Sequence, residues 1–304
     1  RLDRSARMPP AACCEVFPVF NRSFLPLSSL PAALGGRSMK KYWRLLNVGI
    51  QNTLVYRVNF LFRSVFGLIP LFATLSLWRA VYAGKPGDVA GYTLGAMISY
   101  YLVVTIVDAL TAVTEDDWQI VSDIRDGRLS QLLLKPLDYL AYRLTLYVAG
   151  RIVFVVCAIV PAAVFIYFHR EYLVVPADAL TLGAFLISIV LTALLQFFIS
   201  YTMALLAFWV LEVSTFIFIL YSFEYIAGGH LFPLDILPPA LVKALHYTPF
   251  PYQLFFPVNV YLGRATGAAL WSGLFIQFCW VFAAYLAARL VWARGVRHYG
   301  AVGG

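Results

Sequence analysis

Hydrophobic residues dominate the chain in long runs that lack the alternating polar face of a soluble helix or strand. Short charged or proline-containing segments separate these runs. A helix of about twenty apolar residues is long enough to cross the hydrocarbon core of a bilayer. The pattern therefore predicts an all-α integral membrane protein with six transmembrane helices, at about 58–81, 91–113, 146–168, 179–208, 212–229 and 268–292.

The assignment of the fourth and fifth spans depends on one continuous apolar run. Residues 179–227 carry formal charges only at Glu212 and Glu224. The run is more than twice the length that one crossing helix needs. It is therefore predicted to form two spans with a tight turn at Glu212.

Two other apolar segments do not fit a spanning helix. Residues 40–57 interleave apolar side chains with Lys, Arg, Asn and Gln, which predicts an N-terminal amphipathic helix lying in the membrane interface. A polar lead-in to the first span is the alternative. Residues 228–267 are too apolar for a solvated loop, but prolines interrupt them repeatedly and exclude one continuous helix. Short re-entrant helices are predicted there, between spans five and six, with their irregular backbone buried against protein.

The longest charged run, residues 114–145, lies between the second and third spans. Asp116 or Asp117 can cap a short helix that runs to Arg125 and ends at Gly127. A loop that merely connects two spans is the alternative, but it would need neither Trp118 nor the leucines that follow Gly127. The segment is therefore predicted to contact a soluble partner, through the candidate residues Glu115, Asp116, Asp117, Trp118, Arg125, Asp126 and Arg128.

The distribution of positive charge predicts the orientation. Twelve Lys and Arg residues flank the spans on the side that holds residues 114–145, and five flank them on the other side. Because the more positive side of a membrane protein is cytoplasmic, both termini and the charged segment are predicted to be cytoplasmic. The net charge of +8 is explained by this topology and does not indicate nucleic-acid binding. Only 12% of the residues are charged, against about 25% in soluble domains.

Ionisable residues inside the predicted spans are candidates for functional roles, because an unpaired charge in lipid is costly. Arg63, Asp108 and Arg151 each lie about five residues from the inner end of a span, or roughly 7–8 Å deep. Asp108 is predicted to pair with Arg63, or failing that with Arg151. Glu224 lies toward the outer end of the fifth span, where it either lines a transport path or reaches the outer interface.

The N-terminal segment differs from the rest of the chain. Residues 1–38 are rich in Pro, Ser, Ala and Arg and lack the uninterrupted apolar core of a signal peptide. Met39 is followed by two lysines and resembles a natural start. We therefore expect residues 1–38 to be a disordered or non-native extension, and residues 39–304 to form the membrane domain.

No motif for catalysis or for cofactor binding is apparent. The four cysteines form no CxxC pair, and the four histidines have no metal-ligand spacing. The sequence around Gly84-Lys85-Pro86 lacks both the first glycine and the Ser or Thr of a phosphate-binding loop. The chain is therefore predicted not to be an enzyme and to hold no metal or cofactor; any ATP that it uses must be bound by another chain.

The layout as a whole resembles the membrane subunit, or permease, of ABC-2-type transporters. An amphipathic N-terminal helix, six spans, a charged loop after span two and re-entrant segments before the last span all match that family. Residues 124–136 resemble a stretch I-x-x-G-x-L-x-x-L-L-x-x-P of a bacterial subfamily. Residues 228–234, followed by Pro249-Phe250, resemble the G-x-x-F-P-L … P-F segment after span five.

This resemblance implies a permease of an ATP-driven exporter in a bacterial plasma (inner) membrane. Two permeases, identical or related, would line the substrate path, and two ABC ATPase subunits carrying ATP and magnesium would push a coupling helix within residues 115–128. An ion-coupled secondary transporter is the alternative function; such proteins usually show inverted repeats, which this sequence lacks. A membrane-embedded enzyme is a weaker alternative, since all four histidines fall outside the predicted spans.

Overall fold

The computed structural model describes residues 35–84, 87–113, 116–172, 174, 176 and 178–300. The chain divides into two compact units, Arg1–Lys41 and Tyr42–Gly304. Of the first unit, only the beginning of helix α1 (Gly35–Leu54) is described. The predicted extension, residues 1–38, otherwise lies outside the described residues and stays a prediction. Helices α2 to α11 all belong to the second unit.

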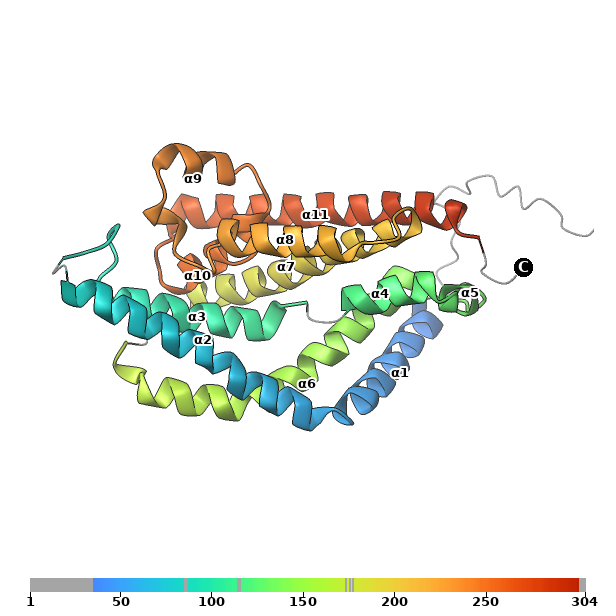
Figure 1. Cartoon of the computed structure of the whole chain (residues 1–304), viewed down its shortest axis with the longest axis horizontal. Helices are drawn as coiled ribbons and strands as arrows, with labels where there is room; N and C mark the ends of the chain where they lie inside the picture. The colour runs from blue at the N-terminus through green and yellow to red at the C-terminus, as the bar shows by residue number, and fades with distance from the viewer. Residues whose placement is uncertain are drawn as a thin grey trace, which may run out of the picture. The chain divides into compact units, whose positions relative to one another are not determined.

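The second unit is helical, and five of its described helices are long and apolar enough to cross a membrane. They are α2 (Arg57–Gly84), α3 (Leu94–Thr111), α6 (Tyr139–Phe168), α7 (Ala179–Ala204) continued by the 3-10 turn η4 (Leu205–Phe208), and α11 (Gly267–His298). Each coincides with one of the predicted spans. The prediction of an all-α, multi-pass membrane fold is therefore confirmed (Figure 1).

The predicted fifth span is a shorter helix. Helix α8 (Ser214–Ala227) is apolar but has 14 residues, which corresponds to about 21 Å, whereas the hydrocarbon core is about 30 Å thick. Helix α8 packs against α7. The predicted turn is confirmed, because Glu212 lies in the non-helical residues between η4 and α8. The count of six spans stays a prediction.

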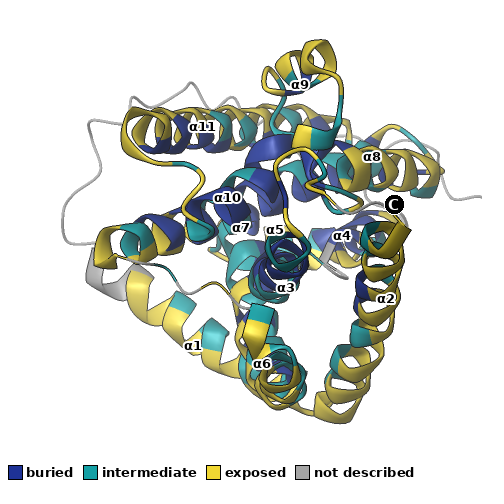
Figure 2. Ribbon diagram, turned by 90° about the vertical axis from the view of Figure 1, so that its left-hand side faces the viewer, coloured by how far each residue is buried: buried dark blue, intermediate teal, exposed yellow. Residues whose placement is uncertain are grey.

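Helix α3 lies at the centre of this unit. It packs against α2, α6, α7 and α10 (Phe255–Tyr261), and most of its side chains are buried, as the dark blue ribbon in Figure 2 shows. Thr93 caps its start by accepting a hydrogen bond from the backbone N–H of Ala96. The hydroxyl of Tyr100 donates to the carbonyl of Gly229 at 2.7 Å, and this bond ties the segment after α8 to α3.

Helices α7 and α11 pack against each other through a buried polar contact. The amide nitrogen of Gln277 donates to the hydroxyl of Thr192 at 3.0 Å and to the backbone carbonyl of Tyr252 at 2.9 Å. Its amide oxygen accepts a hydrogen bond from Ser188 at 3.0 Å. Such bonds hold membrane helices together because lipid offers these groups no alternative partner.

Four short helices connect α8 to α11, as the prolines of this region predict. They are η5 (Leu234–Ile236), α9 (Pro239–Leu245), η6 (Phe250–Tyr252) and α10. Helix α10 is largely buried against α3 and α7, whereas α9 is largely exposed. The irregular backbone is thus partly covered by protein, and the return of this segment into the membrane stays a prediction.

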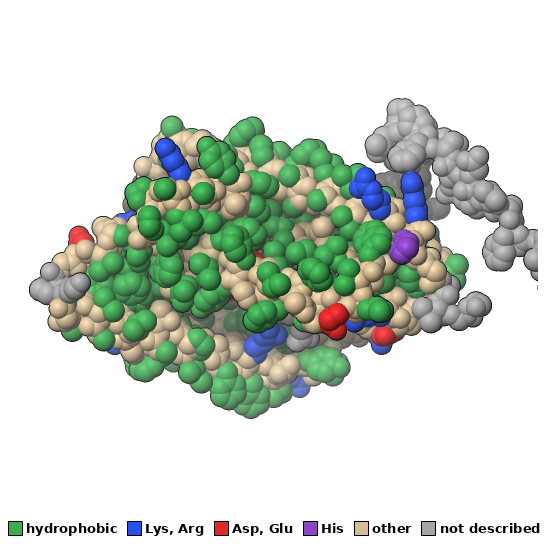
Figure 3. Space-filling model, turned by 45° about the horizontal axis from the view of Figure 1, so that its top comes forward, with side chains coloured by type: hydrophobic (Ala, Val, Ile, Leu, Met, Phe, Trp, Pro, Cys, Tyr) green, Lys and Arg blue, Asp and Glu red, His purple; other side chains and the backbone are tan. Residues whose placement is uncertain are grey.

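Apolar side chains cover the outer surfaces of the long helices. Large aromatic residues are exposed on α2, α8 and α11, including Phe66, Phe218 and Phe275. Figure 3 shows hydrophobic side chains spread over most of the visible face, with charged side chains mainly toward its ends and lower edge. A surface of this kind is stable in contact with lipid rather than with water.

Candidate functional site

The charged segment between the second and third spans folds into two short helices. Helix α4 (Asp116–Arg125) ends just before Gly127, whose φ of +74° is left-handed, and α5 (Arg128–Leu133) follows. The predicted helix and its glycine stop are confirmed. The third span was predicted to begin at residue 146, after a loop over residues 114–145, whereas residues 139–145 already form the first two turns of α6. Asp138 starts that helix early by accepting a hydrogen bond from the backbone N–H of Ala141.

One face of α4 is anchored to α8. The side chain of Asp117 is 1% exposed and accepts a hydrogen bond from the hydroxyl of Tyr221 at 2.8 Å. Tyr221 also lies 3.2 Å from the hydroxyl of Ser200 on α7. The sequence marked Asp117 as part of a surface for a soluble partner. In the fold its carboxylate faces inward and links α4 to the transmembrane helices.

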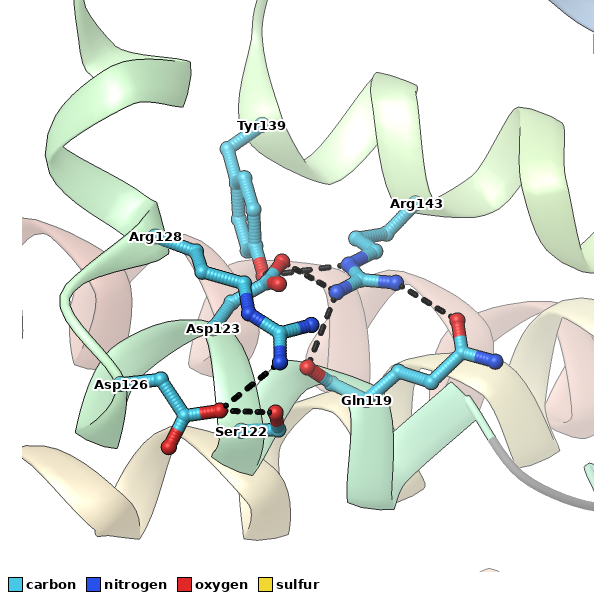
Figure 4. Close-up of polar contacts among 7 residues, drawn as sticks. All are labelled: Gln119, Ser122, Asp123, Asp126, Arg128, Tyr139 and Arg143. Carbon is cyan, nitrogen blue, oxygen red and sulfur yellow. Dashed lines mark hydrogen bonds and ion pairs between the residues drawn. The ribbon is translucent and has the colours of Figure 1, made fainter.

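The same helix is anchored to α6 through a buried ion pair, shown in Figure 4. The guanidinium of Arg143 pairs with the carboxylate of Asp123, and the hydroxyl of Tyr139 donates to that carboxylate at 2.9 Å. Arg143 also donates to the side-chain and backbone oxygens of Gln119, at 3.1 and 3.0 Å. Both members of the pair are buried, and each has further hydrogen bonds. Removing one member would leave an uncompensated charge.

Sequence reasoning missed this network, which consists of Gln119, Asp123, Tyr139 and Arg143. In the sequence, Arg143 contributes only to the prediction of orientation, as one of the twelve Lys and Arg residues on the predicted cytoplasmic side. Tyr139 and Arg143 are four residues apart and so share one face at the start of α6. This spacing could have indicated a shared polar face on α6. It could not identify Asp123 as the partner of that face, because Asp123 lies on a different helix.

The outward face of α4 and the turn after it carry the remaining candidate residues. Trp118 is 47% exposed, and Arg125 is also exposed. Asp126 accepts a hydrogen bond from Ser122 at 2.7 Å and forms an exposed ion pair with Arg128 at 3.1 Å. A groove of about 600 Å³ lies beside them, lined by Trp118, Gln119, Ser122, Asp123, Arg128, Tyr142, Arg143 and Leu146.

Two candidates in this region have no described side chain. Glu115 lies outside the described residues, and Asp116 is described only as the first residue of α4. Their predicted contacts with a partner stay predictions. Trp118, Arg125, Asp126 and Arg128 therefore form the described part of the candidate surface, which we call the outer face of α4.

The three ionisable residues predicted at similar depth line the same cavity. Arg63 of α2, Asp108 of α3 and Arg151 of α6 line one cavity of about 450 Å³. The guanidinium of Arg151 lies over the ring of Phe154, 4.9 Å from its centroid. A direct ion pair between Asp108 and either arginine stays a prediction.

Asp108 also faces a second cavity, of about 180 Å³, between α3, α7 and α8. There its carboxylate lies 3.2 Å from Nε2 of His230. Glu224 lines the same cavity, so the structure brings the two carboxylates predicted in spans two and five together. His230 was missed because it lies outside the predicted spans and 122 residues from Asp108.

No group of three or more His, Cys, Asp and Glu side chains suited to a metal ion occurs among the described residues. A search of curated proteins and a search of solved structures each found no match. A protein-family model for ABC-2 family transporter proteins matches residues 68–303. The match covers most of the chain, from within α2 to beyond α11, and includes both anchors of α4 and the cavity between α3, α7 and α8. The chain therefore belongs to the ABC-2 transporter family and is a multi-pass membrane transport protein.

Proposed function

We infer that this chain is the permease subunit of an ATP-binding-cassette exporter. It forms the substrate path as a dimer, with a second copy or with a related permease. A separate pair of ATPase subunits binds ATP and magnesium and drives it. Membership of the ABC-2 family supports this function and favours it over ion-coupled secondary transport.

One observation carries the proposal. Helix α4 is anchored at two points to transmembrane helices, by Asp117 to α8 and by Asp123 to α6, while its outer face stays exposed. A force applied to that face passes directly to α6 and α8, because buried hydrogen-bonded pairs resist separation. This is the arrangement that a coupling helix requires.

The ATPase contact is assigned to the outer face of α4. Asp126 and Arg128 are well exposed, so their charges are available to a partner. Trp118 supplies a large exposed ring beside the groove, and aromatic residues are frequent anchors in protein interfaces. Glu115 and Asp116 remain candidates at the start of the same helix.

Co-purification tests this assignment. The tagged permease is extracted in mild detergent from cells that contain its native partners. Proteins that co-purify are identified by mass spectrometry, and ATP hydrolysis is measured. A separate ATP-binding protein is expected with the wild type and is expected to be lost with the charge swap Asp126→Arg plus Arg128→Glu.

The matched control is a second charge swap, Asp88→Arg plus Lys243→Glu. It also leaves the net charge unchanged, and both residues are exposed. Asp88 lies between α2 and α3, and Lys243 lies in α9, which Figure 1 shows at the end of the molecule away from α4. It should retain the ATPase. A wild type that purifies alone and hydrolyses no ATP would contradict the proposed function, and equal losses in both swaps would contradict the assigned surface.

The orientation is proposed from the distribution of positive charge, with both termini cytoplasmic in a bacterial plasma membrane. Gln131 in α5 and Lys243 in α9 are both exposed and belong to predicted opposite sides. In a chain without its native cysteines, Lys243→Cys should react with an impermeant maleimide in intact cells. Gln131→Cys should react only after the cells are permeabilised. The reverse result would invert the topology.

A further inference from the structure

The cavity between α3, α7 and α8 is lined by both polar and apolar side chains. Asp108, Gln196, Ser200, Tyr221, Glu224 and His230 supply the polar lining. Val113, Ile199 and Leu220 supply much of the rest. An amphipathic lining of this kind is typical of small-molecule sites, in which a few polar groups fix the orientation of a mainly apolar ligand.

Two buried polar atoms of residues that line this cavity have no hydrogen-bond partner among the described residues, the side-chain oxygen of Gln196 and Nδ1 of His230. Gln196 is 7% exposed, and its side-chain oxygen has no hydrogen-bond partner within the described structure. The described residues also provide no hydrogen bond or ion pair for the carboxylate of Glu224, which lines the same cavity. A buried acceptor without a donor is costly, so the oxygen of Gln196 indicates a donor supplied by something that binds there.

The charges indicate what kind of donor it is. The cavity has two carboxylates, Asp108 and Glu224, and one basic side chain, His230. The imidazole of His230 is within hydrogen-bond distance of Asp108, whereas no described donor forms a hydrogen bond with the carboxylate of Glu224. An ammonium group has only hydrogen-bond donors and carries a positive charge. It therefore complements both the carboxylate of Glu224 and the side-chain oxygen of Gln196.

We propose that this cavity binds the cationic amine of an amphipathic substrate, a site that rests on the proposed function and specifies its substrate class. The cavity volume of about 180 Å³ accommodates an ammonium group with a few carbon atoms, given that one water occupies roughly 30 Å³ of liquid. The apolar part of the substrate lies along Val113, Ile199 and Leu220. Glu224 pairs with the ammonium, and Gln196 accepts one of its hydrogens.

The site is connected to the candidate coupling helix. Tyr221 lines the cavity and also donates its hydroxyl hydrogen bond to Asp117 of α4. A ligand that shifts Tyr221 therefore acts directly on the anchor of α4. Amine binding is accordingly expected to stimulate ATP hydrolysis by the assembled transporter.

Binding by the full-length chain in lipid nanodiscs tests the site. The probe is a dansyl-labelled alkylamine, compared with the alcohol of the same chain length by fluorescence anisotropy. The amine should bind about tenfold or more tightly than the alcohol, as expected for hydrogen bonds to a charged group. Glu224→Gln should abolish that preference, and Glu224→Asp should retain most of it. Glu212→Gln, which removes an exposed carboxylate just before α8, should leave it unchanged.

A wild-type experiment covers the case in which Glu224→Gln does not fold. A hydrophobic carbodiimide activates a carboxyl group, and a bound primary amine then forms an amide with it and releases a urea. Peptide mass spectrometry should find the amine on Glu224 and not on Glu212. Equal labelling of both, equal affinity for amine and alcohol, or displacement of the amine by millimolar sodium or magnesium would overturn the proposal.

These outcomes are separable from the proposed function. Binding to the permease alone does not require the ATPase. If the ATPase co-purifies but the chain does not prefer the amine to the alcohol, the proposed exporter function is supported and the proposed substrate site is wrong. If the amine preference is present but no ATPase co-purifies, the binding site stands and the ATP-driven function is wrong.

Discussion

Two polar regions of this molecule differ in how completely their groups are paired. Where α4 meets α6, Arg143, Asp123, Tyr139 and Gln119 form a closed set of hydrogen bonds, with the ion pair at its centre. In the cavity between α3, α7 and α8, the oxygen of Gln196 has no partner among the described residues.

The difference separates two roles for buried polarity. A fully paired network of hydrogen bonds makes the elements that it joins rigid. In an incompletely paired network, polar atoms without a partner can form hydrogen bonds with a ligand. The α4–α6 contact therefore suits the transmission of force, and the cavity suits the recognition of a ligand. Tyr221 belongs to both regions, since it lines the cavity and contacts Asp117.

The largest expected effect comes from breaking the α4–α6 contact. Arg143→Met leaves the carboxylate of Asp123 buried without its cation and should cost about 3–5 kcal/mol in the free energy of unfolding. Unfolding of the purified chain by SDS titration in mixed micelles, followed by circular dichroism, measures this loss. Adding Asp123→Leu should restore much of it. A double variant less stable than Arg143→Met would show that Asp123 does not depend on Arg143.

The link between the two regions should have a smaller effect. Tyr221→Phe removes a hydrogen-bond donor from the buried carboxylate of Asp117 and should cost about 1–3 kcal/mol, measured in the same titration. Tyr247→Phe is the control, because Tyr247 is 83% exposed and should tolerate the change. Equal stability of both variants and the wild type would mean that Asp117 needs no bond from α8.

Substitution in the turn between α4 and α5 should change the free energy of unfolding by less than Tyr221→Phe does. Gly127 has a left-handed φ of +74°, and no atom lies within 4 Å of where a β-carbon would be. Gly127→Ala should therefore cost about 1–2 kcal/mol through backbone strain alone. Gly150→Ala, at an equally open position inside α6, should instead stabilise the helix by up to about 1 kcal/mol. Destabilisation by both substitutions would point to packing rather than to strain.

The smallest effect on stability is expected on the outer face of α4. Asp126→Ala breaks an exposed ion pair with Arg128 and should change the free energy of unfolding by about 0.5 kcal/mol or less. The same variant should weaken co-purification of the ATPase. This combination would separate a surface that serves a partner from contacts that hold the fold. A large loss of stability would assign Asp126 a structural role instead.

The membrane helices were predictable because their signal is local. Five apolar runs of sufficient length coincide with α2, α3, α6, α7 with η4, and α11, since a helix satisfies its own backbone wherever lipid surrounds it. The turn near Glu212 and the end of α4 at Gly127 were also predictable, because each depends on the residues at that position in the sequence. The early start of α6 was missed, because an N-cap at Asp138 lengthens that helix into the charged segment.

The candidate sites were only partly predictable. Their residue types were visible in the sequence, since Arg63, Asp108, Arg151 and Glu224 stand out in apolar runs. The pairing of Asp108 with His230 across 122 residues was not visible. The inward orientation of Asp117 was also missed, because it depends on where Tyr221 of α8 lies.

The sequence by itself determined that this is a helical membrane protein of the ABC-2 type, because hydropathy and short motifs are properties of neighbouring residues. Only the tertiary structure decided which charges meet. Arg143 forms an ion pair with Asp123, Asp108 lies within hydrogen-bond distance of His230, and Glu224 lines a cavity. These pairings depend on how helices distant in sequence pack together. In a low-dielectric interior, separating a charged side chain from its partner costs several kcal/mol.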